Sequence, residues 1–259
     1  MAKPSNIIPV AQEAHLNWML YSEPGVGKTM LAGTAAEVGK TLWLANNPDE
    51  TVSLRNMKAK PDMWVVDDYN ELSDAAAYVT HEGHKDYEFI VFDNGTLFME
   101  QGMDHIMADL VAQKPHRDLY IPDRAEYLRN QNMFSKQVRA MIGAPVHFIM
   151  TAHVMQMESP EGDDISIPAL PGSKGLYSQK LCGLMNLVTY YRAVSKKGGV
   201  QRVLYTQKSK TMEAKDRFQV LPARMTDPTV PRIMELIGDA TRPGRAKRPA
   251  KKTTRKRAS

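Results

Sequence analysis

The stretch Tyr21-Ser22-Glu23-Pro24-Gly25-Val26-Gly27-Lys28-Thr29 decides how the rest of the chain is interpreted. An apolar run at residues 15–21 precedes it, and an alanine-rich helical pattern at residues 29–39 follows it. Glycines between a strand and a helix let backbone N–H groups approach phosphate oxygens at the positive end of the helix dipole. The stretch therefore predicts a phosphate-binding loop, and the alternative is a glycine-rich turn that binds nothing.

The spacing of the closing residues matches the P-loop pattern, in which Gly is followed by four residues and then by Gly-Lys-Ser/Thr. Gly27-Lys28-Thr29 is intact, whereas Ser22 stands where the first Gly is expected. Lys28 would place its charge at the β- and γ-phosphates of a nucleotide, and Thr29 would offer its hydroxyl to Mg²⁺. The predicted nucleotide-binding residues are Ser22, Glu23, Pro24, Gly25, Val26, Gly27, Lys28, Thr29 and Met30.

The chain has 259 residues, enough for one large domain with appendages. Cys182 is the only cysteine, which excludes an internal disulfide framework and favours a reducing compartment. The chain opens with no signal-like segment, and no apolar run reaches the ~20 residues that cross a bilayer. We therefore expect a cytoplasmic protein with no membrane partner.

The positive charge is concentrated at the C-terminus. Residues 241–259 carry nine of the 34 Lys and Arg residues and no acid, which leaves the body of the chain mildly acidic. A segment rich in Pro, Lys and Arg cannot build a core and is predicted to be disordered. We expect an N-terminal segment 1–14, a folded domain 15–237 and a basic tail 238–259. The tail either binds phosphates non-specifically or only aids solubility.

Short apolar segments alternate with helical patterns, which predicts an α/β fold with a mostly parallel sheet covered by helices on both faces. The expected strands are residues 15–21, 41–45, 64–66, 88–92 and 146–150, and the expected helices are 29–39, 72–80, 97–111 and 125–142. Gly39 is expected to end the first helix in a left-handed cap. A polar loop, 156–175, is followed by a C-terminal antiparallel hairpin, 186–193 and 201–207, at one edge of the sheet.

Polar residues follow several of these strands, and ligands gather at the carboxyl ends of parallel strands. Asp93 ends an apolar strand in the Walker B manner, which would hold the Mg²⁺ water shell; the alternative is a turn-capping Asp. Hydrolysis also needs a group to activate water, and of Asp49 and Glu50 we favour Glu50, the alternative being a solvated helix start. Thr151 and His153 end a further strand, where His153 is either a γ-phosphate sensor or an ordinary structural histidine.

This order of features resembles the RecA-like P-loop NTPase core, and in detail it is similar to phage-encoded RecA-like ATPases of single-strand annealing and recombination. The resemblance covers about residues 15–222 and implies an ATPase that uses ATP and Mg²⁺. The residues that carry it are Pro24-Gly25-Val26-Gly27-Lys28-Thr29, Phe92-Asp93, Thr151-Ala152-His153, Leu170-Pro171-Gly172 and Lys215-Asp216-Arg217.

In RecA-like assemblies a Lys-x-Arg after the terminal hairpin reaches the γ-phosphate of the neighbouring subunit's nucleotide. Lys215 and Arg217 match that pattern and imply a homo-oligomer with ATP at subunit interfaces, a role that suits the guanidinium fork. Lys208 and Lys210 form a rival basic pair, and a solvated basic strand end is the alternative.

Three departures from the RecA pattern predict slow turnover. Ser22 replaces a Gly, Phe218 follows Arg217 where related sequences often carry Gly, and Asn46 and Asn47 lie near the position of RecA's own glutamate.

The resemblance also implies loops that face single-stranded DNA. Residues 113–124 combine cations with an aromatic ring that can stack on a base, and the second-loop position, 156–175, is mostly acidic. Either segment could instead be an ordinary surface loop. The candidate DNA contacts are Lys114, Arg117, Tyr120, Arg124 and Lys174.

The leading hypothesis is an ATP-hydrolysing protein that binds single-stranded DNA and supports phage recombination or strand annealing in the host cytoplasm. Single-strand-binding or replication proteins are its further candidate partners. A second hypothesis is a nucleotide-switched interaction protein that hydrolyses ATP poorly and recruits replication or repair partners. A third, a small-molecule kinase, lacks an evident Arg-rich lid and does not explain the terminal hairpin.

Overall fold

A sheet of ten strands crosses the molecule in a computed structural model that describes residues 15–159, 162–172, 175–196 and 199–241. The strand order is β10-β8-β7-β1-β5-β4-β2-β3, with β6 paired to β5 and β9 paired to β7. The strands are β1 (Asn17–Ser22), β2 (Thr41–Ala45), β3 (Asp62–Val65), β4 (Phe89–Asp93), β5 (His147–Glu158), β6 (Asp164–Pro168), β7 (Leu187–Lys196), β8 (Gly199–Tyr205), β9 (Lys215–Asp216) and β10 (Arg224–Thr226). The segment from β7 to β3 is parallel, and β8 and β10 extend it antiparallel. The predicted α/β class, the mostly parallel sheet and the edge hairpin are therefore confirmed.

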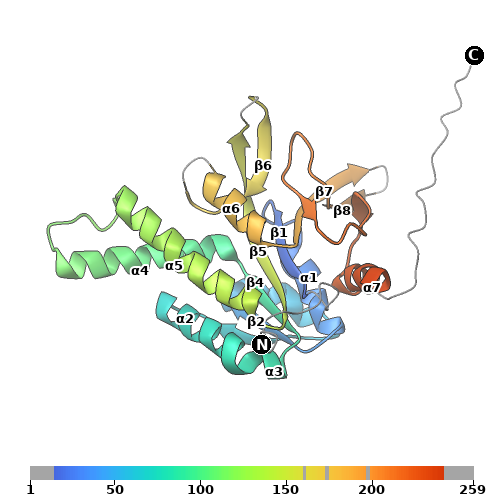
Figure 1. The fold of residues 1–259 in the computed structure, drawn as a ribbon, viewed down its shortest axis with the longest axis horizontal. Coiled ribbons are helices and arrows are strands. Elements are labelled where there is room, and N and C mark those ends of the chain that lie inside the picture. The colour runs from blue at the N-terminus through green and yellow to red at the C-terminus, as the bar shows by residue number, and fades with distance from the viewer. Residues whose placement is uncertain (1–14, 160–161, 173–174, 197–198, 242–259) are drawn as a thin grey trace, which may run out of the picture.

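Helices cover both faces of this sheet (Figure 1). The α-helices are α1 (Lys28–Gly33), α2 (Tyr69–Tyr78), α3 (His84–Asp86), α4 (Gly95–Gln113), α5 (Arg124–Gly143), α6 (Leu176–Leu184) and α7 (Val230–Thr241). Two 3₁₀ segments, η1 (Thr34–Glu37) and η2 (Pro48–Asn56), and one π-helical segment, η3 (Val79–Gly83), complete the set. None of the helices in the described ranges is long and apolar enough to cross a membrane.

The two faces are built by the alternation of side chains along each strand. On β1, Trp18 and Leu20 pack with α1, η2 and α7, whereas Met19 and Tyr21 pack with α2, α4, α5 and α6. All four side chains are fully buried. A parallel strand covered on both faces has no polar side, which explains the unbroken apolar runs in the sequence.

The first helix is shorter than predicted. α1 ends at Gly33 and continues as η1. A side chain at Gly33 would not fit, since its Cβ would lie 2.5 Å from a Leu54 methyl group of η2. Gly39 is not left-handed, so the predicted cap is wrong. It instead leaves room for the Glu88 carboxylate, which a Cβ would meet at 2.6 Å.

The predicted polar loop at residues 156–175 contains a β-ribbon. β5 continues beyond its neighbours to Glu158, and its last five residues pair antiparallel with β6. The ribbon projects from the sheet beside α6 (Figure 1). Polar and acidic residues in this segment concealed its strand pairing in the sequence.

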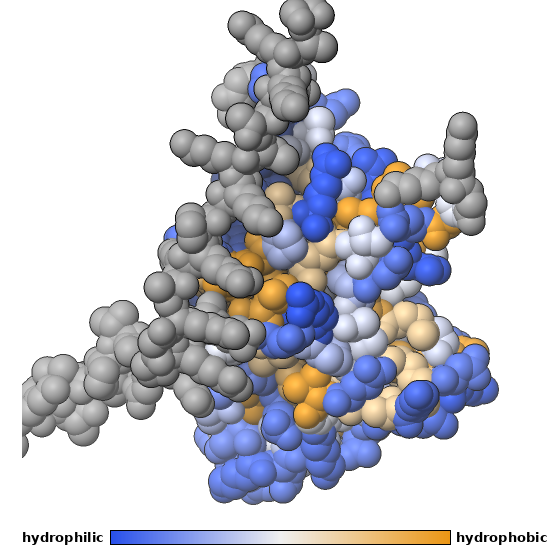
Figure 2. All heavy atoms as spheres, turned by 90° about the vertical axis from the view of Figure 1, so that its right-hand side faces the viewer, coloured by the Kyte–Doolittle hydropathy of each residue, from blue (hydrophilic) through white to orange (hydrophobic). Residues whose placement is uncertain are grey.

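The C-terminal helix α7 runs to Thr241, past the predicted domain boundary at 237. Its residues Val230, Ile233 and Ile237 are buried against the α1 face of the sheet. The predicted N-terminal segment 1–14 and the tail beyond residue 241 lie outside the described residues. On the side that carries α7 and β8, hydrophilic residues surround smaller apolar patches (Figure 2).

Candidate nucleotide-binding site

The predicted P-loop connects β1 to α1, as its sequence indicates. Gly25 and Gly27 have φ angles of 76° and 106°, a left-handed backbone that side chains other than glycine rarely adopt. Ser22 is the buried last residue of β1 rather than part of a flexible turn. Its hydroxyl donates to the Glu23 carbonyl at 2.7 Å and accepts from Lys28 Nζ at 3.1 Å, so it anchors the base of the loop.

Lys28 is buried at the start of α1, and its ammonium also donates to the carbonyls of Ser22 and Glu23 at 3.2 Å each. Burial lowers the pKa of Lys28, and the nearby carboxylates of Asp93, Glu23 and Glu50 oppose that shift. A cation is thus held at the mouth of the loop, where anionic phosphates would meet it.

Asp93 ends β4 as a buried carboxylate, two strands away from the P-loop strand in the sheet. Thr29 Oγ1 donates to its Oδ2 at 3.0 Å, and the Thr151 hydroxyl of the intervening strand β5 donates to its Oδ1. Burial raises the pKa of Asp93, while these hydroxyls and Lys28 lower it. A hydroxyl and a carboxylate in contact form an oxygen donor set that suits Mg²⁺. The structure therefore brings together the two predicted metal residues, Thr29 and Asp93.

Glu50 is an exposed residue of η2, which begins at Pro48 after a cap from Asn47. Partial burial and the charge of Asp93 raise the pKa of Glu50, and Lys28 lowers it. These interactions place Glu50 at the rim of the same site.

Asn46 has a structural role at this edge. Its Oδ1 accepts from the Asn94 backbone N–H, and its Nδ2 donates to the Gln101 side chain, both at 3.3 Å. The side chain therefore holds the backbone that follows Asp93.

His153 pairs in register with Ser22 across β5 and β1. Its backbone N–H donates to Thr96 Oγ1 at 3.0 Å, but its ring Nδ1 is buried without a hydrogen-bond partner among the described residues. Burial and the Lys28 charge lower the pKa of His153, and Asp93 opposes them. A neutral imidazole with an unused nitrogen fits a ligand group at this edge.

Two residues of the C-terminal hairpin also contact the P-loop, and sequence reasoning missed both. The Tyr190 hydroxyl of β7 donates to the Glu23 carboxylate, and Arg202 Nε of β8 donates to the Val26 carbonyl at 2.8 Å. The only signal in the sequence was the predicted hairpin itself, because its register against the loop depends on the folded sheet.

Lys215 and Arg217 do not contact the P-loop of their own chain. β9 pairs with the first residues of β7, so Lys215 lies roughly 10 Å along the strands from the level of Ser22. Lys215 donates to the Cys182 carbonyl, and Arg217 Nη2 donates to the Gly183 carbonyl at 2.8 Å. Both cations thus lie at the C-terminal end of α6, where they complement the helix dipole.

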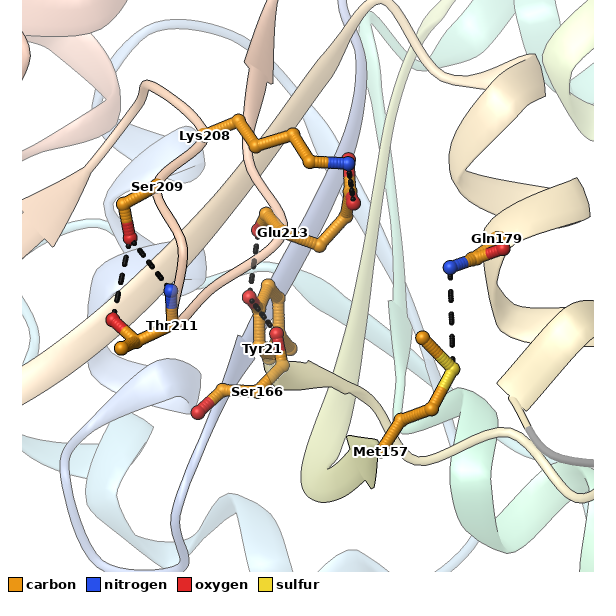
Figure 3. A network of polar contacts seen from close by, with 8 residues as sticks. All are labelled: Tyr21, Met157, Ser166, Gln179, Lys208, Ser209, Thr211 and Glu213. Carbon is orange, nitrogen blue, oxygen red and sulfur yellow. Dashed lines mark hydrogen bonds and ion pairs between the residues drawn. The ribbon is translucent and has the colours of Figure 1, made fainter. Parts of the chain in front are cut away.

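The rival cation Lys208 is engaged nearby, as Figure 3 shows. It forms an ion pair of 2.8 Å with Glu213, whose backbone carbonyl accepts from the Tyr21 hydroxyl at 2.6 Å. The same hydroxyl lies 2.9 Å from the Ser166 carbonyl. Lys208 therefore belongs to a network that joins β1, β6 and the segment before β9.

The candidate DNA residues of the α4–α5 connection lie at the outer end of a helical hairpin (Figure 1). Tyr120 is 86% exposed, and Lys114 and Arg124 are also exposed. Arg117 instead pairs with Asp123 at 2.5 Å and with Glu126 at 3.6 Å, so its charge stabilises the start of α5. Lys174 lies outside the described residues.

A family model described as "AAA domain" matches residues 14–218, a range that contains the P-loop, Asp93 and His153. The chain belongs to this AAA domain family. The family supports nucleotide hydrolysis in general, so the P-loop ATPase part of the resemblance is confirmed. The phage RecA-like assignment of this AAA domain stays a prediction. No curated protein matches the chain.

Proposed function

We propose that this AAA domain binds ATP with Mg²⁺ at the carboxyl edge of its sheet, hydrolyses the ATP, and uses this cycle on single-stranded DNA in phage recombination or strand annealing. The observation that carries the proposal is the cluster of Lys28, Thr29, Asp93 and Thr151. Four groups from two strands and one helix converge there within hydrogen-bonding or electrostatic range.

The loop would bind phosphate through charge and backbone. Gly25 and Gly27 leave the loop backbone uncovered, and Lys28 supplies a point charge whose amino group lies near the loop carbonyls. Thr29 and Asp93 would hold Mg²⁺, which neutralises charge on the phosphates. Thr151 keeps the Asp93 carboxylate oriented from the far side.

Two residues would act on the attacking water or on the terminal phosphate. Glu50 has its pKa raised by burial and by Asp93, which strengthens a carboxylate as a proton acceptor. His153 is kept neutral by burial and by Lys28, so its free Nδ1 can accept or donate one hydrogen bond. Glu50 would serve as the general base and His153 as the phosphate sensor.

The DNA part of the proposal is supported by the exposed α4–α5 connection. Tyr120 offers a stacking surface, and Lys114 and Arg124 offer charge for the phosphate backbone. Arg117 is left out of the proposal because its charge is paired with Asp123 and Glu126.

The same proposal includes an oligomer. Lys215 and Arg217 lie away from their own loop but are placed outside the core, so they would act on the nucleotide of a neighbouring subunit. An arginine finger supplied by a neighbour is a known way to stabilise phosphoryl transfer.

The decisive experiment measures phosphate release by the full chain with and without single-stranded DNA. DNA is expected to stimulate hydrolysis, and the stimulation should survive truncation after Thr241 but be lost in Tyr120→Ala/Lys114→Ala. Lys58→Ala, a change of an exposed lysine elsewhere, is the matched control. If DNA changed the rate of hydrolysis in none of these proteins, the DNA-binding part of the proposal would be refuted, whereas the ATPase part would not.

A second candidate function is a nucleotide-switched interaction protein. The same helical tip exposes Leu119 (41%), Ile121 (63%) and Leu128 (57%), an apolar surface that favours a protein partner. ATP-dependent capture of a replication or repair protein that Ile121→Ser/Leu128→Ser abolishes, without DNA stimulation, would favour this reading.

A further inference from the structure

The antiparallel β7–β8 hairpin contacts the P-loop at two points. Tyr190 reaches Glu23 at the start of the loop, and Arg202 reaches Val26 near its end. Tyr190 is also stacked on Tyr21 of β1, with ring centroids 4.9 Å apart and an interplanar angle of 15°. The hairpin therefore packs against both the strand that enters the loop and the loop itself.

The Arg202 contact fixes the orientation of one peptide group. In a trans peptide the C=O and the following N–H point in opposite directions. Arg202 Nε donates to the Val26 carbonyl, so the N–H of Gly27 points away from Arg202. Backbone N–H groups of a P-loop are the groups that cradle phosphates.

Gly27 shows how closely the arginine approaches. A Cβ built on Gly27 would lie 3.3 Å from Arg202 Nε, and the φ angle of 106° already disfavours any other residue. The loop and the hairpin thus meet at a position where only glycine fits.

Arg202 is itself held firmly. Its backbone N–H donates to Asp227 Oδ1 at 3.3 Å, and its carbonyl accepts from the Asp227 backbone N–H at 2.8 Å. β8 pairs with β7 on one side and β10 on the other. No carboxylate forms an ion pair with the Arg202 guanidinium within the described ranges, so no counter-charge neutralises it beside the phosphate-binding loop.

We propose that Arg202 is a positioning residue of the nucleotide site: it holds the Val26–Gly27 peptide so that the Gly27 N–H faces the phosphates. Tyr190 fixes the other end of the loop through Glu23. This inference rests on the proposed nucleotide site and deepens it. Because Arg202 acts through the loop backbone, ATP and ADP should depend on it equally.

The test compares Arg202→Ala, Arg202→Lys and the control Arg224→Ala. Arg224 is an exposed cation of the adjacent strand β10 that lies over the Tyr205 ring at 5.2 Å. Arg202→Ala is expected to raise the Kd of both ATP and ADP about tenfold, the loss of one charged hydrogen bond at an exposed site. KM for ATP should rise in step while kcat stays within about twofold. Arg202→Lys, which keeps a cationic donor, should recover part of the affinity, and Arg224→Ala should change nothing.

Two kinetic results would overturn the proposal. A large fall in kcat with unchanged ADP affinity would make Arg202 a group that contacts the γ-phosphate instead. Unchanged Kd and KM in Arg202→Ala would show that the contact does not position the loop.

A second measurement separates this inference from the proposed function. Amide hydrogen exchange of residues 23–28 without nucleotide should be faster in Arg202→Ala than in wild type, and unchanged in Arg224→Ala. If the wild-type protein bound no nucleotide, the proposed function would be refuted. The exchange rates would still show whether Arg202 holds the loop backbone. Equal exchange in all three proteins would overturn the positioning role.

Discussion

Strand β5 carries one histidine at each end of its parallel segment, residues 147–153, and the two are used differently. His147 opens the strand at the amino edge of the parallel sheet, and its Nδ1 accepts the Leu16 backbone N–H at 2.9 Å. His153 lies at the carboxyl edge, where its Nδ1 has no partner among the described residues. Burial is the main cause of the lowered pKa of both rings.

The difference lies in what each edge leaves unsatisfied. At the amino edge, His147 accepts the Leu16 N–H, and Asn186 accepts the Asn17 N–H and donates to the His15 carbonyl, whereas the Asn17 side-chain oxygen has no partner among the described residues. At the carboxyl edge, His153 Nδ1 has no partner among the described residues, and the charge of Lys28 lies next to the loop carbonyls. A buried histidine is therefore a functional candidate when its ring nitrogen is unused, and its pKa alone does not decide the matter.

The largest expected effect is at the carboxyl edge. Lys28→Ala should lower the rate of phosphate release on the order of 10²–10³-fold, because the loop loses its only buried cation near the phosphates. Lys40→Ala, which removes an exposed lysine paired with Asp62 at 3.7 Å, is the matched control. Retention of a tenth or more of wild-type activity by Lys28→Ala would contradict the assignment of the nucleotide site to the carboxyl edge.

The next largest effect is expected at the amino edge of the sheet, where Lys215 and Arg217 lie. Arg217→Ala should reduce hydrolysis about 100-fold or more if the residue serves a neighbouring subunit. An equal mixture with Lys28→Ala should then restore about a quarter of wild-type activity, the share of interfaces with both intact parts.

The control for this mixture is Lys210→Ala, an exposed cation of the preceding turn. If the Arg217 bond to the Gly183 carbonyl is its whole role, Arg217→Ala would lose stability but little activity, and mixing would restore nothing.

His147 should make stability depend on pH. Burial lowers its pKa to about 4 in the folded protein, against about 6.5 in the unfolded chain, so protons bind the unfolded state first as pH falls below 6.5. Its contribution is complete above pH 6.5, and about 2 kcal/mol of it is lost by pH 5. Urea unfolding at pH 7.5 and pH 5 measures this loss, which His147→Asn should reduce. An equal loss in both proteins would contradict the assignment.

The smallest effect is on the titration of His153. Its imidazole should titrate below the ordinary histidine range, because burial and Lys28 both lower its pKa. Asp93→Asn should lower the pKa further, and Lys28→Ala should raise it, whereas His147 should respond to neither change. Side-chain NMR of the titrating rings tests this, and identical shifts at both histidines would erase the contrast between the two edges.

Local patterns predicted one half of the site. Residues 21–29, Asp93 and His153 each follow a short apolar strand, and the carboxyl ends of parallel strands meet at one edge by geometry alone. Their convergence therefore required only the strand assignments to be right. Ser22, which stands where the pattern has Gly, is accommodated as the last residue of β1, where its hydroxyl accepts a hydrogen bond from Lys28.

The remaining contacts depend on long-range register. Arg202 and Val26 are 176 residues apart, and a shift of one residue in β8 would turn Arg202 to the opposite face of the sheet. The pairing of β5 with β6 was hidden for a related reason, because Gln156 and Glu158 are too polar to suggest a buried strand. Asn46 lies near the position of RecA's glutamate in the sequence, but in the fold its side chain accepts a hydrogen bond from the Asn94 backbone.

Both strands of the β5–β6 ribbon are anchored at the carboxyl edge of the sheet, beside the candidate nucleotide site. The β5 half of the ribbon begins at Val154, directly after His153, and β6 ends at Pro168, directly before Ala169, whose N–H donates to the His153 carbonyl at 2.8 Å. The Thr96 hydroxyl donates to the Ala169 carbonyl, also at 2.8 Å, and joins the end of β6 to α4, the helix that follows Asp93. A tilt of this base would displace the far ends of the two strands, at Glu158 and Asp164, by a larger distance than the base itself, so a small change around the nucleotide site would become a larger movement at the surface.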